Sequence, residues 1–518
     1  MHHRTVYRWL VFFLLGLLAF SSSGALPAQP RVRGARRTRD LSQFRKQHVD
    51  LRSKFIRQLD ELAAECEEKG LAEGAEAVRT VSAPVDTAEL RLAPLPREVQ
   101  KPIPADLPMD ERHWQTQLRF QRTEYAKDLY LLSRHTLNSG HVSYAYDLIR
   151  EVALQDPDHT VARRILGFVR SGDEWLSAFE SRMQREKKVW HEKFGWIPRD
   201  HVERYEKGER FYNNRWMSAA KEAESRHNFK FAWEVRTEHY LVRTNHSLER
   251  GVELASKLEN YYGLFFQLMA GFFNSPDQVQ QLFAGAGAKP QANNKQHVVH
   301  YYRERDEYMA ALRQETTQPI EITRGMYFPR NGIAFFFFDP DNDDDSTLYH
   351  EATHQLLSGS RPKTGEVGIK GNFWIIEGIA CYMESFHREG ERFAVGDPRH
   401  GRIQAARAHL VNDKYYVPIR EFTRMGMTAY QGSPNIRKNY SQGAALTHFF
   451  MHYDDGKYRE ALIEHLSQIY SDNRLTREAP ESLEDLTGVE AEELDQQYVR
   501  YLRDLPDAND RESAGVGE

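Results

Sequence analysis

The chain has 518 residues, of which 40% are hydrophobic and 12% aromatic, and a formal net charge of −5. This composition predicts a globular protein with room for two or three domains. The weak negative charge and the lack of a basic domain or a zinc-finger spacing argue against a nucleic-acid partner. The two cysteines, Cys66 and Cys381, lie in very different contexts, so we expect packing rather than disulfides to stabilise the fold.

The first 28 residues have the pattern of a secretory signal peptide. Basic residues and histidines at positions 2–8 precede an apolar run at 9–20, and small residues near Ala25 and Ala28 suit cleavage. The run is short for a membrane span, and no second run approaches twenty residues. We therefore expect an exported protein, secreted or periplasmic, with no stable membrane span after cleavage.

The N-terminal part of the mature chain is predicted to be helical. Residues 29–81 are charged, with Phe55, Leu59 and Leu62 at helical spacing. Prolines recur between 84 and 108, so we place a proline-rich linker at 82–112. Residues 113–228 are predicted to form a helical subdomain, with helices at 125–137, 143–154 and 160–168. It resembles one tetratricopeptide-like unit without a second copy. Its aromatic residues leave open a protein partner bound through this region.

Residues 229–508 are predicted to form a larger domain with a small mixed sheet, and residues 509–518 a disordered tail. Alternation at 233–244 indicates one strand or two. The expected elements that follow are a long helix at 248–273, a surface loop at 278–294, a strand at 298–302, a helix at 307–312, and a hairpin formed by 326–328 and 333–338. The predicted fold class is therefore α+β and mostly helical.

The segment 350–354 has the pattern H-E-x-x-H. Two histidines four residues apart on a helix project from one face, so the imidazoles of His350 and His354 can reach one zinc ion. Glu351 lies beside the first ligand and can act as a general base toward water. Acidic residues at 343–345 precede the segment and suit the start of a helix.

A second apolar helix is predicted at 374–384, and it carries Glu377 and Glu384. A carboxylate in an apolar helix is costly unless it is paired or binds a metal. Glu377 is therefore interpreted as a third ligand, which leaves one position open as in catalytic zinc sites; a salt bridge at the helix start is the alternative. Glu384 is interpreted as a partner of a metal ligand or of a substrate amine, or else as a surface carboxylate. Cys381 either faces the metal or is a small buried thiol.

The two motifs, H-E-x-x-H and W-x-x-E-G-x-A-x-Y-x-E at 374–384, resemble those of the gluzincin zinc peptidases, the aminopeptidase-N-like and peptidase-MA-like branch. They are also similar to a group of secreted bacterial domains of unknown function. The resemblance covers about the last half of the chain and implies Zn²⁺ bound by His350, His354 and Glu377, with Glu351 as general base. The chain differs from the aminopeptidases in a longer interval before Glu377 and in lacking a Gly-x-Met-x-Asn segment.

The same resemblance extends to two further segments. Residues 439–446 are similar to a Tyr-x-x-Gly-Ala segment whose tyrosine stabilises the transition state, which implies that Tyr440 donates to the developing oxyanion; a packed tyrosine at a helix start is the alternative. The hairpin before the zinc helix is the implied substrate edge, or else a buried strand. His448 and His452 form a second pair at the same spacing, without an intervening glutamate, and are expected to be exposed or packed rather than ligands.

These features together predict an exported zinc metallopeptidase that hydrolyses bonds in a peptide or protein substrate. Two alternatives stay open. One is a helical interaction protein with a structural zinc site, in which a fourth side chain such as Cys381 completes the coordination. The other is a zinc amidase that acts on cell-wall amides, because the same activation of water serves both reactions.

Overall fold

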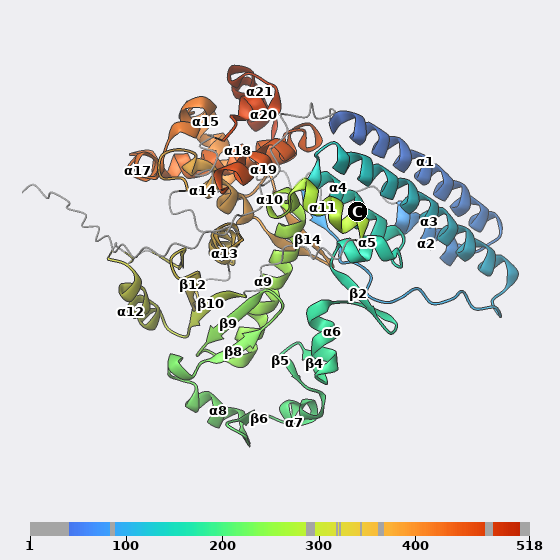
Figure 1. Ribbon diagram of the computed structural model, residues 1–518, viewed down its shortest axis with the longest axis horizontal. Helices are drawn as coiled ribbons and strands as arrows, with labels where there is room; N and C mark the ends of the chain where they lie inside the picture. The colour runs from blue at the N-terminus through green and yellow to red at the C-terminus, as the bar shows by residue number, and fades with distance from the viewer. Residues whose placement is uncertain are drawn as a thin grey trace, which may run out of the picture. The chain divides into compact units, whose positions relative to one another are not determined.

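The computed structural model of the chain describes residues 41–82, 89–285, 296–317, 320, 323–341, 344–360, 367–471 and 480–507 (Figure 1). These residues belong to one compact unit that spans residues 39–518. The expected signal peptide at 1–28 and tail at 509–518 lie outside the described residues. The described part is mostly helical with small sheets, which confirms the α+β, mostly helical class.

The N-terminal helices pack together in one layer, coloured blue to teal in Figure 1. They are α1 (Leu41–Glu68), α2 (Ala72–Ser82), α3 (Met109–Asn138), α4 (Val142–Gln155) and α5 (Thr160–Ile165). Apolar residues at helical spacing, such as Phe55 and Leu59 of α1, are buried with Leu129 of α3 and Ile149 of α4. The predicted helices of this region are confirmed, and the likeness to a tetratricopeptide unit stays a prediction.

The segment at 82–112 is not a linker along its whole length. Leu90–Leu92 forms β1, which pairs antiparallel with β14 (Arg392–Val395), and β14 pairs with β13 (His387–Glu389). The buried side chain of Arg163 donates a hydrogen bond to the carbonyl of Pro96 at 2.5 Å. The prolines keep the backbone extended, and these long-range partners, which the local sequence does not reveal, attach it to the fold.

Three β-hairpins follow α5, where the sequence predicts a helical subdomain. They are β2 (Phe168–Ser171) with β3 (Glu174–Ser177), β4 (Lys188–His191) with β5 (Gly195–Pro198), and β6 (Glu209–Tyr212) with β7 (Arg215–Ser218). The short helices between and after them are α6 (Ala178–Arg185), η1 (Arg199–His201), α7 (Val202–Glu206), α8 (Ala219–Ser225) and η2 (Phe229–Phe231). The prediction of a helical subdomain at 113–228 is therefore wrong beyond α5.

The three hairpins are copies of one unit. Trp175, Trp196 and Trp216 each occupy the second position of the second strand. Each tryptophan packs on the helix before its own hairpin; the ring of Trp196, for example, lies 6.0 Å from that of Phe179 in α6, and the guanidinium of Arg204 in α7 lies 3.7 Å from the ring of Trp216. Strands of four residues are too short for alternation to identify them, whereas the regular spacing of the tryptophans was a usable signal.

A five-stranded mixed sheet forms the centre of the second half of the chain. Its strands are β8 (Trp233–Arg236), β9 (Tyr240–Thr244), β10 (His297–Tyr302), β11 (Gly325–Phe328) and β12 (Ile333–Phe337), in the order β11-β12-β10-β9-β8. The three central strands are parallel, and the two edge strands β8 and β11 are antiparallel to their neighbours. The predicted strands and the hairpin of β11 and β12 are confirmed.

Helices cover both faces of this sheet. α9 (Leu248–Leu268) and α13 (Ser346–Gly359) share a core with Val242 and Ala334, whereas α12 (Arg305–Glu315) packs through Tyr308 on the opposite face. α10 (Ala270–Phe273) follows α9. The predicted surface loop at 278–294 is wrong in its first part, because α11 (Pro276–Ala284) buries Val279 and Leu282 in the core of the N-terminal helices; residues 286–295 lie outside the described residues.

The C-terminal part is helical. Its helices are α14 (Phe373–Met383), α15 (Gly401–Val411), α16 (Ile419–Arg424), α17 (Met427–Gln431), α18 (Ile436–Gly456), α19 (Arg459–Ile469), α20 (Leu483–Thr487) and α21 (Ala491–Asp504). α14 and α18 cross so closely that a Cβ on Gly378 would lie 2.6 Å from the carbonyl oxygen of Gly443. Within the part of the chain that the structure describes, none of the helices has the length and apolar character needed to cross a bilayer.

Candidate metal centre

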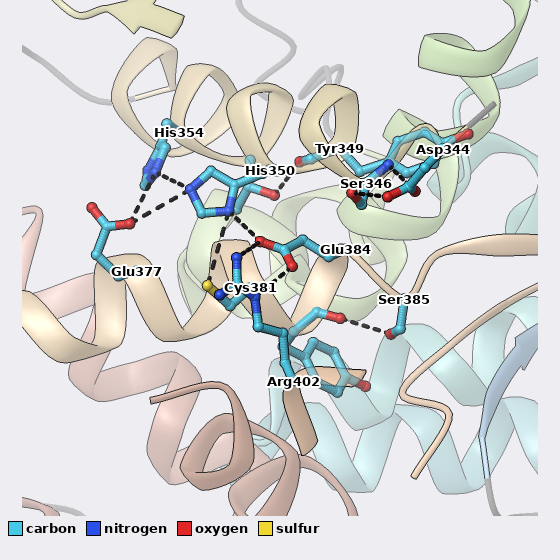
Figure 2. Close-up of polar contacts among 12 residues, drawn as sticks. Asp344, Ser346, Tyr349, His350, His354, Glu377, Cys381, Glu384, Ser385 and Arg402 are labelled. Carbon is cyan, nitrogen blue, oxygen red and sulfur yellow. Dashed lines mark hydrogen bonds and ion pairs between the residues drawn. The ribbon is translucent and has the colours of Figure 1, made fainter. Parts of the chain in front are cut away.

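Helix α13 is fixed on one side and carries the two motif histidines on the other. Leu356 is buried in the core, Thr353 makes a hydrogen bond with Tyr261, and Gln355 donates to the carbonyl of Val298 in β10 at 2.9 Å. These contacts set the rotation of the helix about its axis. The imidazoles of His350 and His354 therefore point toward α14 (Figure 2).

Helix α14 supplies the carboxylate that faces this pair. All eleven of its residues are buried, and Glu377 is only 8% exposed. A buried carboxylate needs a charged or hydrogen-bonding partner. Figure 2 shows Glu377 turned toward His354 and His350, as the interpretation of Glu377 as a third ligand requires.

The three side chains bring their donor atoms together at one point. The Nε2 atoms of His350 and His354 lie 3.2 Å apart, and the Oε2 atom of Glu377 lies 3.5 Å and 3.6 Å from them. Two ligands about 2.0–2.1 Å from a tetrahedral zinc ion are roughly 3.3 Å from each other. The residues are thus a group that could hold a metal ion, and the spacing of their donors fits zinc.

The electrostatics of the group suit a cation. Burial disfavours the charged form of Glu377, but the charge on His354 and the interaction with His350 outweigh it and hold the pKa of Glu377 well below its usual range. Burial also opposes protonation of His350, yet Cys381, Glu377 and Glu384 hold its pKa well above the usual value. The surroundings therefore stabilise positive charge where a metal ion would bind.

Glu384 lies on the far side of His350. Its Oε1 atom is 2.9 Å from Nδ1 of His350, and Arg402 donates two hydrogen bonds to the same carboxylate at 2.8 and 3.0 Å. Burial opposes ionisation of Glu384, but these two partners lower its pKa to about 2. An ionised carboxylate at Nδ1 accepts the ring proton there and leaves the Nε2 lone pair directed at the metal position.

Arg402 was not predicted from the sequence. It lies in α15, which the chain reaches only after the β13–β14 hairpin, so no local spacing connects it with Glu384. The sequence did show Glu384 as a carboxylate in an apolar helix, which is costly unless it is paired or binds a metal. The structure identifies the pairing cation as Arg402 and shows Glu384 as a partner of His350 rather than a surface carboxylate.

A second group of donors, His350, Cys381 and Glu384, is less suited to a metal. It uses the Nδ1 atom of His350, from which the Cys381 sulfur lies 4.0 Å away. Burial raises the pKa of the Cys381 thiol, and Arg402 already neutralises Glu384. Because Cys381 lies beside the opposite ring nitrogen, it is not placed to complete the coordination formed by His350, His354 and Glu377.

The predicted general base and the predicted oxyanion partner lie on different elements. Glu351 accepts a hydrogen bond from the backbone amide of Tyr327 in the edge strand β11, at 2.8 Å. Tyr440 lies in the second turn of α18, and burial, with the charge of Glu377 second, raises its pKa. α18 crosses α14, the helix that carries Glu377, closely at Gly378 and Gly443.

The second histidine pair is packed, as one of the sequence alternatives expected. His448 is buried and His452 is partly exposed, and their rings make hydrogen bonds with Tyr501 and Tyr382, respectively. Burial lowers the pKa of His448 to about 4 and that of His452 well below the usual value. Neutral imidazoles in this environment act as packed hydrogen-bonding groups.

The structure thus brings His350, His354 and Glu377 together, and Glu384 contacts His350 from the other side of its ring. Glu351 lies on the same helix and is bonded to the amide of Tyr327 in β11. Tyr440 approaches from α18. Comparison of the sequence with models of known protein families and with curated proteins found no match. The functional argument is therefore made from the geometry of these side chains.

Proposed function

We propose that the protein is an exported zinc-dependent metallopeptidase of the gluzincin type. The observation that carries the proposal is the convergence of two imidazole nitrogens and one carboxylate oxygen at separations of 3.2, 3.5 and 3.6 Å. Two histidines and one glutamate are a ligand set of catalytic zinc sites, where a fourth position is left for water or substrate. Cys381 lies beside the wrong nitrogen to fill that position.

His350, His354 and Glu377 would hold the ion. When bound, zinc supplies Lewis-acid chemistry, since it polarises a peptide carbonyl and makes a water molecule more acidic. Glu351 receives the proton of the attacking water on its carboxylate and delivers it to the nitrogen of the leaving amine. The amide of Tyr327, which donates to Glu351 Oε2, orients this carboxylate.

Two further side chains support the reaction. Tyr440, whose raised pKa keeps its hydroxyl protonated at neutral pH, donates a hydrogen bond to the carbonyl oxygen as negative charge develops there. Glu384 and Arg402 fix the ring orientation of His350. In this scheme Glu351 alone transfers the proton. The other residues bind the zinc ion, hydrogen-bond to the substrate carbonyl oxygen, or orient His350.

The test is a Glu351→Gln variant, compared with wild type in metal analysis and in digestion of a broad peptide library. We expect wild-type protein to contain zinc and hydrolyse peptides, and the variant to keep zinc but lose about 10²- to 10⁴-fold of the rate, because the amide cannot accept the proton. Glu391→Gln is the matched control, since Glu391 is 83% exposed. Full activity of Glu351→Gln, or wild-type protein without bound zinc, would contradict the proposal.

A further inference from the structure

A cavity of about 540 Å³ lies at one end of the central sheet. Its lining comes from the residues that directly follow β10 and β12 and directly precede β11. β10 and β12 are parallel and β11 is antiparallel to β12. The segments that follow β10 and β12 and the segment that precedes β11 therefore meet at the same end of the sheet. Crevices outside the carboxyl ends of parallel strands are frequent ligand sites.

The charged lining of this cavity favours an anion. Three arginines contribute to it, Arg303, Arg305 and Arg324, against two acidic residues, Glu304 and Asp339. The lining therefore carries a net charge of three minus two, or +1. The Arg324–Asp339 ion pair is long, at 3.8 Å, and Arg324 is 55% exposed. Guanidinium groups bind carboxylates through two parallel hydrogen bonds, so a carboxylate suits this lining.

The strand that leads into the cavity is the edge strand next to Glu351. Met326 and Phe328 alternate with Gly325 and Tyr327 along β11, and alternate residues of an antiparallel strand direct their backbone groups to opposite sides. The amide of Tyr327 donates to Glu351 rather than to β12. The backbone groups of Tyr327 and Gly325 therefore face away from β12, toward the side from which an extended peptide can add to the sheet.

Charge decides the direction in which such a peptide lies. A peptide antiparallel to β11 runs parallel to β10 and β12, so its carboxyl end points to the cavity. A peptide in the opposite direction would bring its positively charged amino end toward this lining, whose net charge is also positive. Arg324 precedes Tyr327 by three residues, which is about 10 Å of extended chain. Tyr327 lies beside the proposed general base, because its amide donates a hydrogen bond to Glu351.

We propose that this cavity is a substrate subsite that binds a carboxylate about three residues C-terminal to the bond that is cleaved. The inference rests on the proposed peptidase function. The carboxylate is either an acidic side chain within a longer peptide or the C-terminal carboxylate of a short one. Both sources present the same group to the arginines, and they differ in whether the enzyme cleaves within chains or releases short C-terminal fragments.

The experiment uses wild-type protein with bound zinc and three internally quenched, C-terminally amidated peptides that differ only in Glu, Gln or Lys at the third position after the cleaved bond. A fourth peptide ends there with a free carboxylate. We expect the Glu peptide to exceed the Lys peptide in kcat/KM by about tenfold, which corresponds to about 1.4 kcal/mol. Preference for the fourth peptide over the amidated Glu peptide identifies the C-terminal carboxylate as the source.

Arg324→Glu tests the residue assignment, and Arg305→Glu is a second variant that must act in the same direction. We expect either change to remove the preference for Glu over Lys and to weaken binding of the Glu peptide to the inactive Glu351→Gln protein by a similar factor, measured by fluorescence anisotropy. Arg330→Glu is the matched control, because Arg330 is 80% exposed in the turn at the opposite end of β11, and it should keep the preference.

The outcomes separate the two proposals. If wild-type protein cleaves none of the peptides and none of a broad library, the peptidase function fails. If it cleaves the four peptides at similar rates, or if Arg324→Glu and Arg330→Glu behave alike, the carboxylate subsite is wrong while the peptidase function stands.

Discussion

Two pairs of histidines in this molecule share the same spacing along a helix and differ in everything around them. The rings of His350 and His354 on α13 lie 4.9 Å apart, and those of His448 and His452 on α18 lie 4.3 Å apart. Both pairs are thus close enough for a single ion to bridge. The helix alone produces this proximity, because residues four apart occupy the same face.

The neighbours of each pair decide what it can do. Glu377 faces the first pair from α14, whereas Tyr382, Tyr501 and the carbonyl of Gly396 surround the second. Among the described residues, each group with the composition and spacing of a metal site contains His350, and none contains His448. The spacing of four residues therefore allows two histidines to bind one metal ion. A metal site also needs a third donor, which a different element of the fold must supply.

Replacement of one histidine in each pair tests this comparison, and the expected difference in bound zinc is the largest effect that we predict. We expect His354→Gln to lose bound zinc, since two donors remain from a set of three. His452→Gln should keep zinc, because its partner is the Tyr382 hydroxyl at 2.8 Å. Zinc content after gel filtration and dialysis against a weak chelator measures both.

The result is read together with far-ultraviolet circular dichroism, so that loss of the fold is not mistaken for loss of the ligand. Equal loss of zinc in two folded variants would show that the α18 pair also binds metal. Retention of zinc in a folded His354→Gln protein would show that the α13 pair does not bind the metal.

The residues of the candidate metal site could be predicted from the sequence because their signals are local. His350, Glu351 and His354 lie on one helical turn, and Glu377 is conspicuous as a carboxylate in an apolar segment. Strands β10, β11 and β12 were likewise predicted from short apolar runs. In each case the residues that carry the signal are neighbours in the sequence, so a periodic pattern or an unusual residue is enough.

The rest depends on partners that are distant in the sequence. Arg402 reaches Glu384 only through packing of α15 on the metal helices, and β1 exists only because β14 lies beside it. The three hairpins were misassigned because each strand is four residues long and the stabilising contact is made by a tryptophan with the preceding unit. Tertiary contacts of this kind leave no local periodicity.

The buried His448 of α18 predicts a dependence of stability on pH. The pKa of His448 is lowered to about 4, below its ordinary value, so the unfolded chain binds a proton at higher pH than the folded chain does. Stability from the neutral ring is fully present above the unfolded pKa and is lost as pH falls toward 4. For this one group the loss of unfolding free energy between pH 7 and pH 5 is about 2 kcal/mol.

Urea unfolding of wild type and His448→Gln at both pH values measures this term, because other titrating groups are common to the two proteins. The wild type should lose about 2 kcal/mol more than the variant. An identical pH dependence in wild type and His448→Gln would contradict the neutral, buried state of His448.

Replacement of Arg402 has the smallest expected effect. Arg402 contacts Glu384, which contacts His350, so it acts on the α13 pair and not on the α18 pair. Arg402→Ala leaves a buried carboxylate without its guanidinium partner, so the ring of His350 is less firmly oriented. We expect zinc affinity to fall by about tenfold, the lower end of the range for changes behind metal ligands. Competition with a chromophoric chelator measures the affinity.

Two variants on the same residue and helix make this result specific. Arg402→Lys should lose less affinity than Arg402→Ala, since one charged donor can still reach Glu384 although the two-bond contact is lost. Arg407→Ala, also on α15, removes a contact with Asp507 and should leave zinc affinity unchanged. If Arg402→Ala and Arg407→Ala lower the affinity equally, the effect comes from α15 as a whole. Glu384 would then not transmit the orientation of Arg402 to the metal ligand.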